Sequence, residues 1–195
     1  MMKKIETLFC LIFITAILSS CNNNPSMNQI KKQDQKEDME ITKKLSTIPV
    51  PAEFLGNEKD SLYLKTGWYK VSDDKTNGIP KKILINGQIQ TIYIDPFPQL
   101  SVKDIEVFYL VKNPRDLSRL NIVMYFTSIG TEKWSYLTEK SIHKQLAFVI
   151  NNVVVSNPMV QSHITHGVAL FDGNDYTPEE IYAIKRLLET QKNLK

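Results

Sequence analysis

The apolar residues of this chain are unevenly spread. They are dense in residues 5–18, sparse in residues 22–47, and regularly placed after that. The first dense run, residues 8–18, is too short to cross a bilayer, which needs about 20 apolar residues. Because two lysines precede this run and small residues follow it, we predict that residues 1–20 are a secretory signal peptide.

The predicted signal ends at Leu18-Ser19-Ser20-Cys21. This tetrapeptide resembles the bacterial lipobox, which is an aliphatic residue, two small residues and a cysteine. In that class the thiol receives a diacylglycerol, the signal is cut before the cysteine, and the new amino group is usually acylated. Two or three acyl chains would anchor the chain stably, since each buried CH₂ contributes about 0.8 kcal/mol. The resemblance predicts lipid attachment at Cys21; the alternatives are an ordinary secretory signal and an uncleaved anchor.

The residue after Cys21 is Asn22, whereas an aspartate commonly marks retention in the inner membrane. By this resemblance we expect the lipid on Cys21 to hold the protein at the outer membrane, facing the periplasm. The following stretch is rich in Asn, Gln, Lys, Asp and Glu, and cannot bury enough apolar surface to offset its ordering entropy. We therefore expect the lipidated cysteine and a flexible tether over residues 21–60.

Regular patterns begin after the tether. Residues 61–119 contain a strand at 67–71 and two strands, 82–85 and 88–94, on either side of Asn86-Gly87. Asn-Gly supplies the two positive-φ residues of a type I′ turn, so these strands are predicted to form a hairpin. Ser101-Val102-Lys103-Asp104 resembles a capping box and predicts a short helix or turn.

Residues 120–192 carry the signals of a series of strands and two helices. Asn151-Asn152 suggests a second tight hairpin, and Thr177-Pro178-Glu179-Glu180 carries the capping signals of a helix start. The resulting fold class is α+β, a mainly antiparallel sheet with two principal helices packed on one face. The expected elements are a strand at 120–126, a helix from 128 or 131 to 143, strands at 147–150, 153–155 and 168–171, and a helix from 177 to about 190.

Charge and cysteine content narrow the functional classes. The formal net charge is +3, and the charged residues of the predicted domain are interspersed, which gives no electrostatic case for a nucleic-acid partner. The chain has only two cysteines, Cys10 and Cys21, and the first lies within the predicted signal. A disulfide framework and a cysteine-based metal site are therefore not expected.

Few residues suggest catalysis or metal binding. His163-x-x-His166 could offer two imidazoles, but it lacks an acidic or thiol partner at ligand spacing, so exposed loop histidines are the favoured interpretation. Asp172-Gly173-Asn174-Asp175 looks like part of a calcium loop, yet a turn before the last helix explains it better. There is no Gly-x-Ser-x-Gly elbow. We expect no enzyme activity, cofactor or metal. Four aromatic residues could form a peptide-contacting patch, although core positions are commoner for such residues: Trp68, Tyr69, Trp134 and Tyr136.

Specific stretches within residues 120–188 resemble a known domain, the head subdomain in the first periplasmic domain of SecD, the protein-translocation accessory subunit. The matching stretches are Phe126-Thr127-Ser128-x-Gly130, Trp134-x-x-Leu137-Thr138, Leu146 to Asn152, Val154-x-Ser156-x-Pro158-x-Val160, Ile164-x-x-Gly167-x-Ala169, and Gly173 followed by Tyr176-Thr177-x-Glu179-Glu180. The resemblance implies the head fold and a tendency to contact polypeptides. SecD also has transmembrane helices that couple proton flow to motion, and this chain has no comparable apolar run after residue 20.

These observations favour a non-enzymatic, membrane-anchored accessory module of the bacterial envelope. It would contact a protein or peptide, for example by adding a strand to an open sheet edge. One alternative is an immunity or inhibitor lipoprotein that protects against a secreted toxin, a role that suits a small tethered domain. An unrecognised hydrolase is the weakest alternative, because nothing in the sequence places a nucleophile beside a base.

Overall fold

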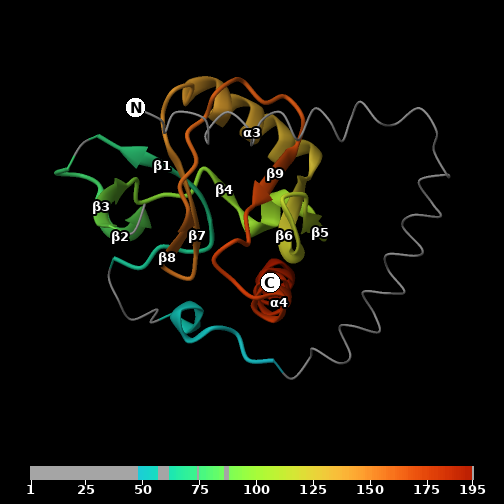
Figure 1. Ribbon diagram of the computed structural model, residues 1–195. Helices are drawn as coiled ribbons and strands as arrows, with labels where there is room; N and C mark the ends of the chain where they lie inside the picture. Colours follow the sequence, from blue (N-terminus) through green and yellow to red (C-terminus); the bar gives the residue numbers. More distant parts are fainter. Residues whose placement is uncertain (1–47, 57–61, 74, 86–87, 195) are drawn as a thin grey trace, which may run out of the picture. The chain divides into compact units, whose positions relative to one another are not determined.

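The computed structural model describes residues 48–56, 62–73, 75–85 and 88–194 (Figure 1). The expected signal peptide, Cys21 and most of the expected tether lie outside these residues. Within the expected tether range, residues 48–56 are described and contain a short 3-10 helix, η1 (Ala52–Leu55). Its Phe54 is fully buried, so this segment contributes a side chain to the core of the domain.

After η1, the described residues form nine strands, two α-helices and a second short 3-10 helix. This composition confirms the α+β class. All strand pairs are antiparallel. The elements are β1 (Gly67–Ser72), β2 (Ile79–Ile85), β3 (Gln88–Ile94), β4 (Leu100–Ser101), η2 (Val102–Asp104), β5 (Ile105–Asn113), β6 (Asp116–Phe126), α3 (Ser128–Lys140), β7 (Leu146–Ile150), β8 (Val153–Ser156), β9 (Val168–Phe171) and α4 (Pro178–Asn193).

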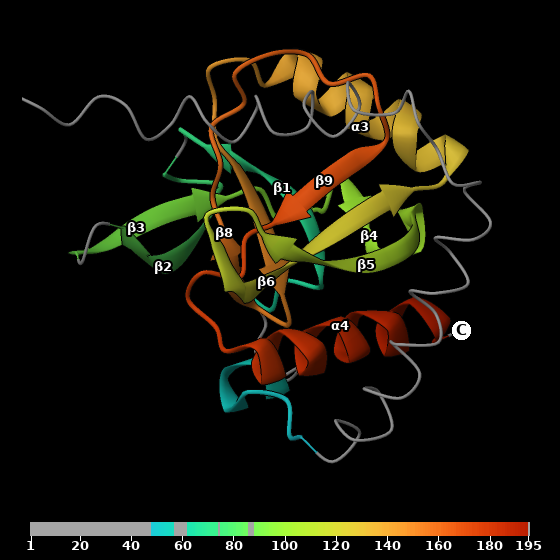
Figure 2. The same cartoon turned by 45° about the vertical axis from the view of Figure 1, so that its right-hand side comes forward.

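The strands form two sheets. The large sheet has the order β2-β3-β1-β7-β8, with β4 also pairing with β1, and the small sheet has the order β5-β6-β9. The outer strands β2 and β8 of the large sheet contact each other, so this sheet curls. In the view of Figure 2, α3 lies at the top and α4 at the bottom, with the strands of the small sheet between them in the picture. The sequence pattern predicted most of the strands and both principal helices but did not divide the strands between two sheets.

The two predicted hairpins are present. Strands β2 and β3 pair with Ile85 opposite Gln88, the register that a two-residue turn requires; Asn86 and Gly87 themselves lie outside the described residues. Between β7 and β8, Asn151 and Asn152 have φ angles of 45° and 74°. These left-handed values are those of a type I′ turn, which confirms the second hairpin prediction.

Strand β7 is buried on both faces because a separate core lies on each side of it. Its odd and even positions point in opposite directions. Leu146, Phe148 and Ile150 belong to the first core, together with residues of the small sheet and both helices. Ala147 and Val149 belong to the second core, which the curled large sheet encloses.

The helix starts follow their sequence signals. Thr127 caps α3 by accepting a hydrogen bond from the Gly130 N–H at 3.0 Å. Thr177 caps α4 by accepting from the Glu180 N–H at 3.2 Å, and the Glu180 carboxylate accepts from the Thr177 N–H at 2.8 Å, which completes a capping box. The predicted capping box at Ser101 is also present, and it opens η2.

The helix ends differ from the predictions. Helix α3 ends at Lys140 rather than His143, because His143 has a φ of 61° and its N–H donates to the Val160 carbonyl at 2.8 Å. Helix α4 continues to Asn193, beyond the expected end near Thr190. Strand β5 was not predicted from the sequence, and β6 begins at Asp116 rather than at the predicted Leu120.

Candidate functional site on the outer face of the small sheet

The register of the small sheet separates its two faces. Residues directly opposite one another in neighbouring strands point to the same side of a sheet. One row contains Phe108, Met124 and Ala169, and the next contains Leu110, Ile122 and Phe171. All six residues belong to the first core or pack against it. This face is therefore the inner face of the small sheet.

Both principal helices pack on that inner face. The large buried apolar side chains of α3 and α4 belong to the same first core: Trp134, Leu137, Ile181, Ile184 and Leu188. The helices and the large sheet thus enclose the inner face, and the packing of two helices on one face confirms the predicted arrangement.

The outer face of the small sheet carries the intervening residues. One row contains Tyr109, Val123 and Leu170, and the adjacent row contains Val107, Tyr125 and Val168. None of these residues belongs to either core. Tyr125 is 42% exposed. With Val111, which also points outward, they form what we call the outer patch: Val107, Tyr109, Val111, Val123, Tyr125, Val168 and Leu170.

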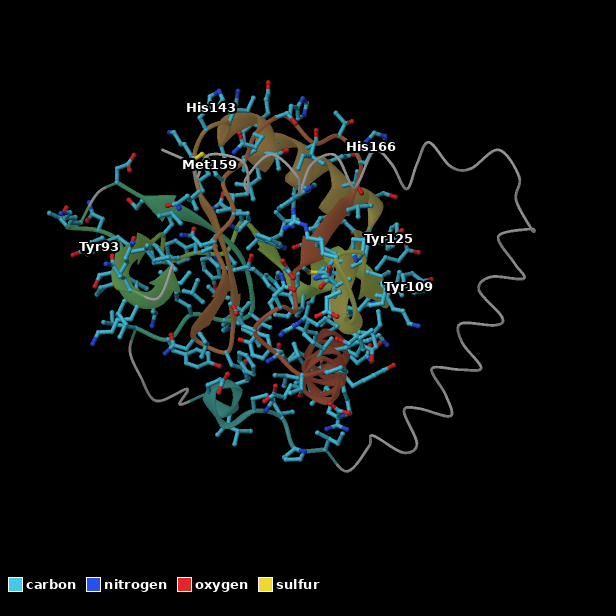
Figure 3. All side chains as sticks on the ribbon, in the orientation of Figure 1. Tyr93, Tyr109, Tyr125, His143, Met159 and His166 are labelled. Atoms are coloured by element: carbon cyan, nitrogen blue, oxygen red, sulfur yellow. The ribbon has the colours of Figure 1, made fainter. Side chains whose placement is uncertain are left out.

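Two tyrosines stand at the centre of the outer patch. The rings of Tyr109 and Tyr125 meet edge to face, with centroids 5.6 Å apart and an interplanar angle of 86°. Figure 3 shows both side chains on the side of the small sheet that faces away from β7 and β8. Such an aromatic pair contributes about 0.5–1.5 kcal/mol beyond its burial. The pair therefore gives the outer patch a preformed aromatic surface with two hydroxyl groups.

Polar contacts fix the loop beside the outer patch. The side-chain oxygen of Asn121 accepts from the Gly173 N–H at 3.1 Å. The Asp172 carboxylate accepts from the Asn174 N–H and side-chain amide at 3.2 and 2.8 Å. Burial raises the pKa of the Asp172 carboxyl, and the nearby Asp175 raises it further. This geometry confirms the turn interpretation of residues 172–175.

The three histidines are exposed side chains. His163 Nε2 lies 2.8 Å from Ser135 Oγ, and the carbonyl of His166 accepts from the Val168 N–H at 2.8 Å. No carboxylate in the described part of the chain bonds to His163, so its contact with Ser135 lacks the orienting acid of a triad. Across the described ranges, no three His, Cys, Asp or Glu side chains gather where they could hold a metal ion.

The aromatic residues singled out from the sequence mostly lie in the interior. Trp68 and Trp134 are 2% and 4% exposed, with ring centroids 5.0 Å apart, and Tyr69 is fully buried. Burial also raises the pKa of the Tyr69 hydroxyl, which donates to the Lys65 carbonyl at 2.6 Å. Only Tyr136 is exposed, at 61%. These four residues therefore do not form one contact patch, and the aromatic surface comes instead from Tyr109 and Tyr125.

A polar depression of about 220 Å³ lies where β1, β7 and the end of α3 meet. Side chains of both charge signs line it, including Lys70, Lys140, Lys144, Asp73 and Asp95. It offers neither an apolar floor nor a cluster of one charge sign. Compared with this depression, the outer patch is the better candidate for contact with another molecule.

The folded domain matches a known protein family. A family model of the SecDF P1 head subdomain matches residues 84–189, which are more than half of the 195-residue chain. The chain belongs to the SecDF P1 head family. The match contains the stretches from 120 to 188 that resembled the SecD head, and it extends back to the first hairpin, so the predicted resemblance is confirmed.

One solved SecDF structure shares this fold. A structure of a membrane component SecDF that enhances protein export aligns with a TM-score of 0.50 and 18% identity, over 71% of this chain. A crystal structure of SecDF in a super-membrane-facing form aligns with a TM-score of 0.46 and 26% identity, over 50% of this chain. This P1 head protein spans 65% of the first solved chain and 13% of the second. No curated protein sequence gives a significant match.

One solved SecDF is a membrane component, which raises the question of whether a helix of this chain could span a bilayer. In the described ranges, neither α3, α4 nor a shorter helix combines the length and apolar character needed to span a bilayer. Cys21, the predicted point of attachment, lies outside those ranges. Lipid attachment and the position in the envelope accordingly stay predictions.

Proposed function

We propose that this P1 head protein is a non-enzymatic accessory module of the bacterial envelope that contacts a protein or peptide. A lipid on Cys21 would hold it at the membrane outside the cytoplasm. Membership of the SecDF P1 head family supports an accessory role, and one solved SecDF is a membrane component that enhances protein export. Here the same kind of domain would act from a lipid anchor.

The outer patch is the observation that carries the proposed contact. Apolar patches that remain on a folded surface often mark sites of protein interaction, and tyrosine is enriched in such interfaces. Tyr109 and Tyr125 present rigid rings, while the neighbouring valines provide apolar contact area. An extended or partly unfolded polypeptide exposes apolar side chains that this surface can cover. The proposed ligand is therefore a polypeptide segment with apolar residues.

The predicted anchor explains why such a surface would be tethered. A lipid on Cys21 confines the domain to the membrane surface, and the residues that follow set how far it can reach. The asparagine at position 22 favours the outer membrane over inner-membrane retention. A tethered domain encounters polypeptides that emerge at or cross the same membrane, which raises its effective concentration near them.

Site-specific photo-crosslinking in cells tests the contact. A photoreactive amino acid at Tyr125 samples the outer patch, and the same amino acid at Tyr136 is a matched control, since both are exposed tyrosines of the same domain. We expect crosslinked proteins from position 125 and few or none from position 136. Equal crosslinking at both positions, or none at 125, would contradict a polypeptide contact through the outer patch.

A further inference from the structure

Strand β5 is an open edge of the small sheet. The strand order β5-β6-β9 puts it at the margin, and among the described residues its ladder partner is β6 alone. Figure 1 shows β5 at the rim of the domain. An edge strand has unpaired backbone N–H and C=O groups along its free side, which can pair with another strand. At nine residues, β5 is long for an unprotected edge.

The sequence of β5 is complementary to itself when it is reversed. If two copies pair antiparallel about Tyr109, residue 106 of one copy lies opposite residue 112 of the other. Glu106 then meets Lys112 at both ends of the paired segment, and both residues are exposed. These ends coincide with the register shifts of β5 against β6, between Ile105 and Val107 and between Lys112 and Asn113. Between them, Val107 meets Val111 and Phe108 meets Leu110. Opposite charges facing each other across strands stabilise a pair, and like charges destabilise it.

We propose that β5 pairs with β5 of a second copy of this chain, so that the two small sheets join into one continuous sheet. The two outer patches then become one surface, because Val107, Tyr109 and Val111 point to the outer face in both copies. The charge complementarity favours a second copy over an unrelated strand, since Glu106 and Lys112 match only a strand with the reversed charge order. The dimer goes beyond the proposed function and does not depend on a polypeptide ligand.

One side chain already contacts this edge. Lys192 of α4 donates a hydrogen bond to the Glu106 carbonyl at the start of β5. This contact lies at one end of the strand and leaves the centre around Tyr109 available. The competing interpretation is that Glu106 and Lys112 protect the edge against association, which is a common use of charged residues on edge strands. Reversing the charges separates the two interpretations.

Disulfide crosslinking of the full chain in its own membrane tests the geometry. Position 109 lies on the two-fold axis, so Tyr109→Cys places two cysteines within the roughly 4.4–6.8 Å Cα separation of a disulfide. Tyr125→Cys is the matched control: it lies one strand further in and opposite Val107 rather than Tyr109. Its copies are therefore separated by three strand spacings, about 14 Å, across the sheet, and they are also offset along the strands. We expect a band of twice the monomer mass for Tyr109→Cys, above the levels of the control and of the unsubstituted chain.

Charge reversal tests the pairing register. Combined with Tyr109→Cys, Glu106→Lys and Lys112→Glu should each lower the crosslinked fraction several-fold, because each brings like charges together at both ends. The double reversal should restore it. Since both residues are exposed, circular dichroism should show that all variants remain folded.

Three results would overturn the proposal: no dimer band above the Tyr125→Cys control, single reversals without effect, or no recovery in the double reversal. A Tyr109→Cys adduct of another mass would assign the edge to a different protein and would also overturn it. Polypeptide contact at Tyr125 is read separately by photo-crosslinking, so the two proposals can fail independently.

Discussion

Lys133 of α3 and Asp104 of η2 form an ion pair with a nitrogen-to-oxygen distance of 2.6 Å. The second carboxylate oxygen of Asp104 accepts from the Ser101 N–H at 2.8 Å. The Asp104 carboxylate therefore links η2, which precedes β5, to α3, which follows β6. Asp104 is only 9% exposed. Hydrogen bonds to a charged group contribute about 1.5–3 kcal/mol each in such a setting.

We expect Asp104 to make folding stability depend on acid pH. Burial alone would raise the pKa of its carboxyl, but hydrogen bonds from Lys133 and Ser101 outweigh burial and hold the pKa below its ordinary value. A lowered folded pKa gives stability that is present above the unfolded pKa, about 3.9, and is lost as pH falls through the folded pKa. Urea midpoints should therefore fall below about pH 4, and less steeply in Asp104→Asn.

The Lys133→Met variant is the control for this acid dependence. It keeps the carboxylate and the Ser101 contact but removes the ion pair, so its acid dependence should lie between those of the unsubstituted chain and Asp104→Asn. Other carboxylates titrate in the same range, and the comparison between variants subtracts them. Parallel midpoint curves for all three proteins would mean that Asp104 does not act in this way.

Gly130 is expected to tolerate no side chain. In an exposed helix, alanine is more favourable than glycine by about 1 kcal/mol. At Gly130, however, a Cβ would lie 2.2 Å from the backbone oxygen of Asp104, which cannot rotate away. We expect Gly130→Ala to lower the free energy of unfolding by about 1–3 kcal/mol. Chemical denaturation would measure this, with Glu132→Ala on the exposed side of α3 changing stability by less than about 0.5 kcal/mol.

Trp134 should matter through its size rather than its indole nitrogen. Its ring packs against Trp68 and Phe126 with centroids 5.0 and 5.2 Å away, and its buried Nε1 has no hydrogen-bond partner within the described structure. We expect Trp134→Ala to cost about 3–5 kcal/mol of stability. Trp134→Phe keeps a ring and loses no hydrogen bond, so it should cost less than half as much. Equal losses in thermal or urea unfolding would indicate an unrecognised role for the indole N–H.

Much of the fold could be predicted because its signals are local. The Thr177 capping box and the Asn151-Asn152 turn each involve a few adjacent residues whose backbone geometry their side chains favour. Strand β5 was missed for a physical reason. Its apolar run does not alternate with polar residues, since Phe108 faces the core while Tyr109 faces the outer patch. Both faces of β5 are apolar, so period-two alternation gives no signal.

The candidate site could not be predicted from the sequence because it depends on register. Tyr109, Val123 and Leu170 come from three separate strands and become neighbours only when β5, β6 and β9 pair. The sequence also cannot distinguish a core tryptophan from a surface one. Trp68 and Trp134 were therefore plausible contact residues until the fold placed them inside the first core. Membership of the SecDF P1 head family indicates the fold, but it does not indicate which face of the small sheet stays exposed.

The predicted anchor can be tested directly at Cys21. If a lipid is attached there, cells grown with labelled palmitate should transfer label to the unsubstituted chain and not to Cys21→Ala. Because the signal is cut only after the cysteine is modified in this class, Cys21→Ala should also keep residues 1–20 and migrate as a longer precursor. Membrane association alone is a poor readout, since an uncut apolar signal would also hold the chain at the membrane. Label on Cys21→Ala, or normal cleavage without label, would favour an ordinary secretory signal instead.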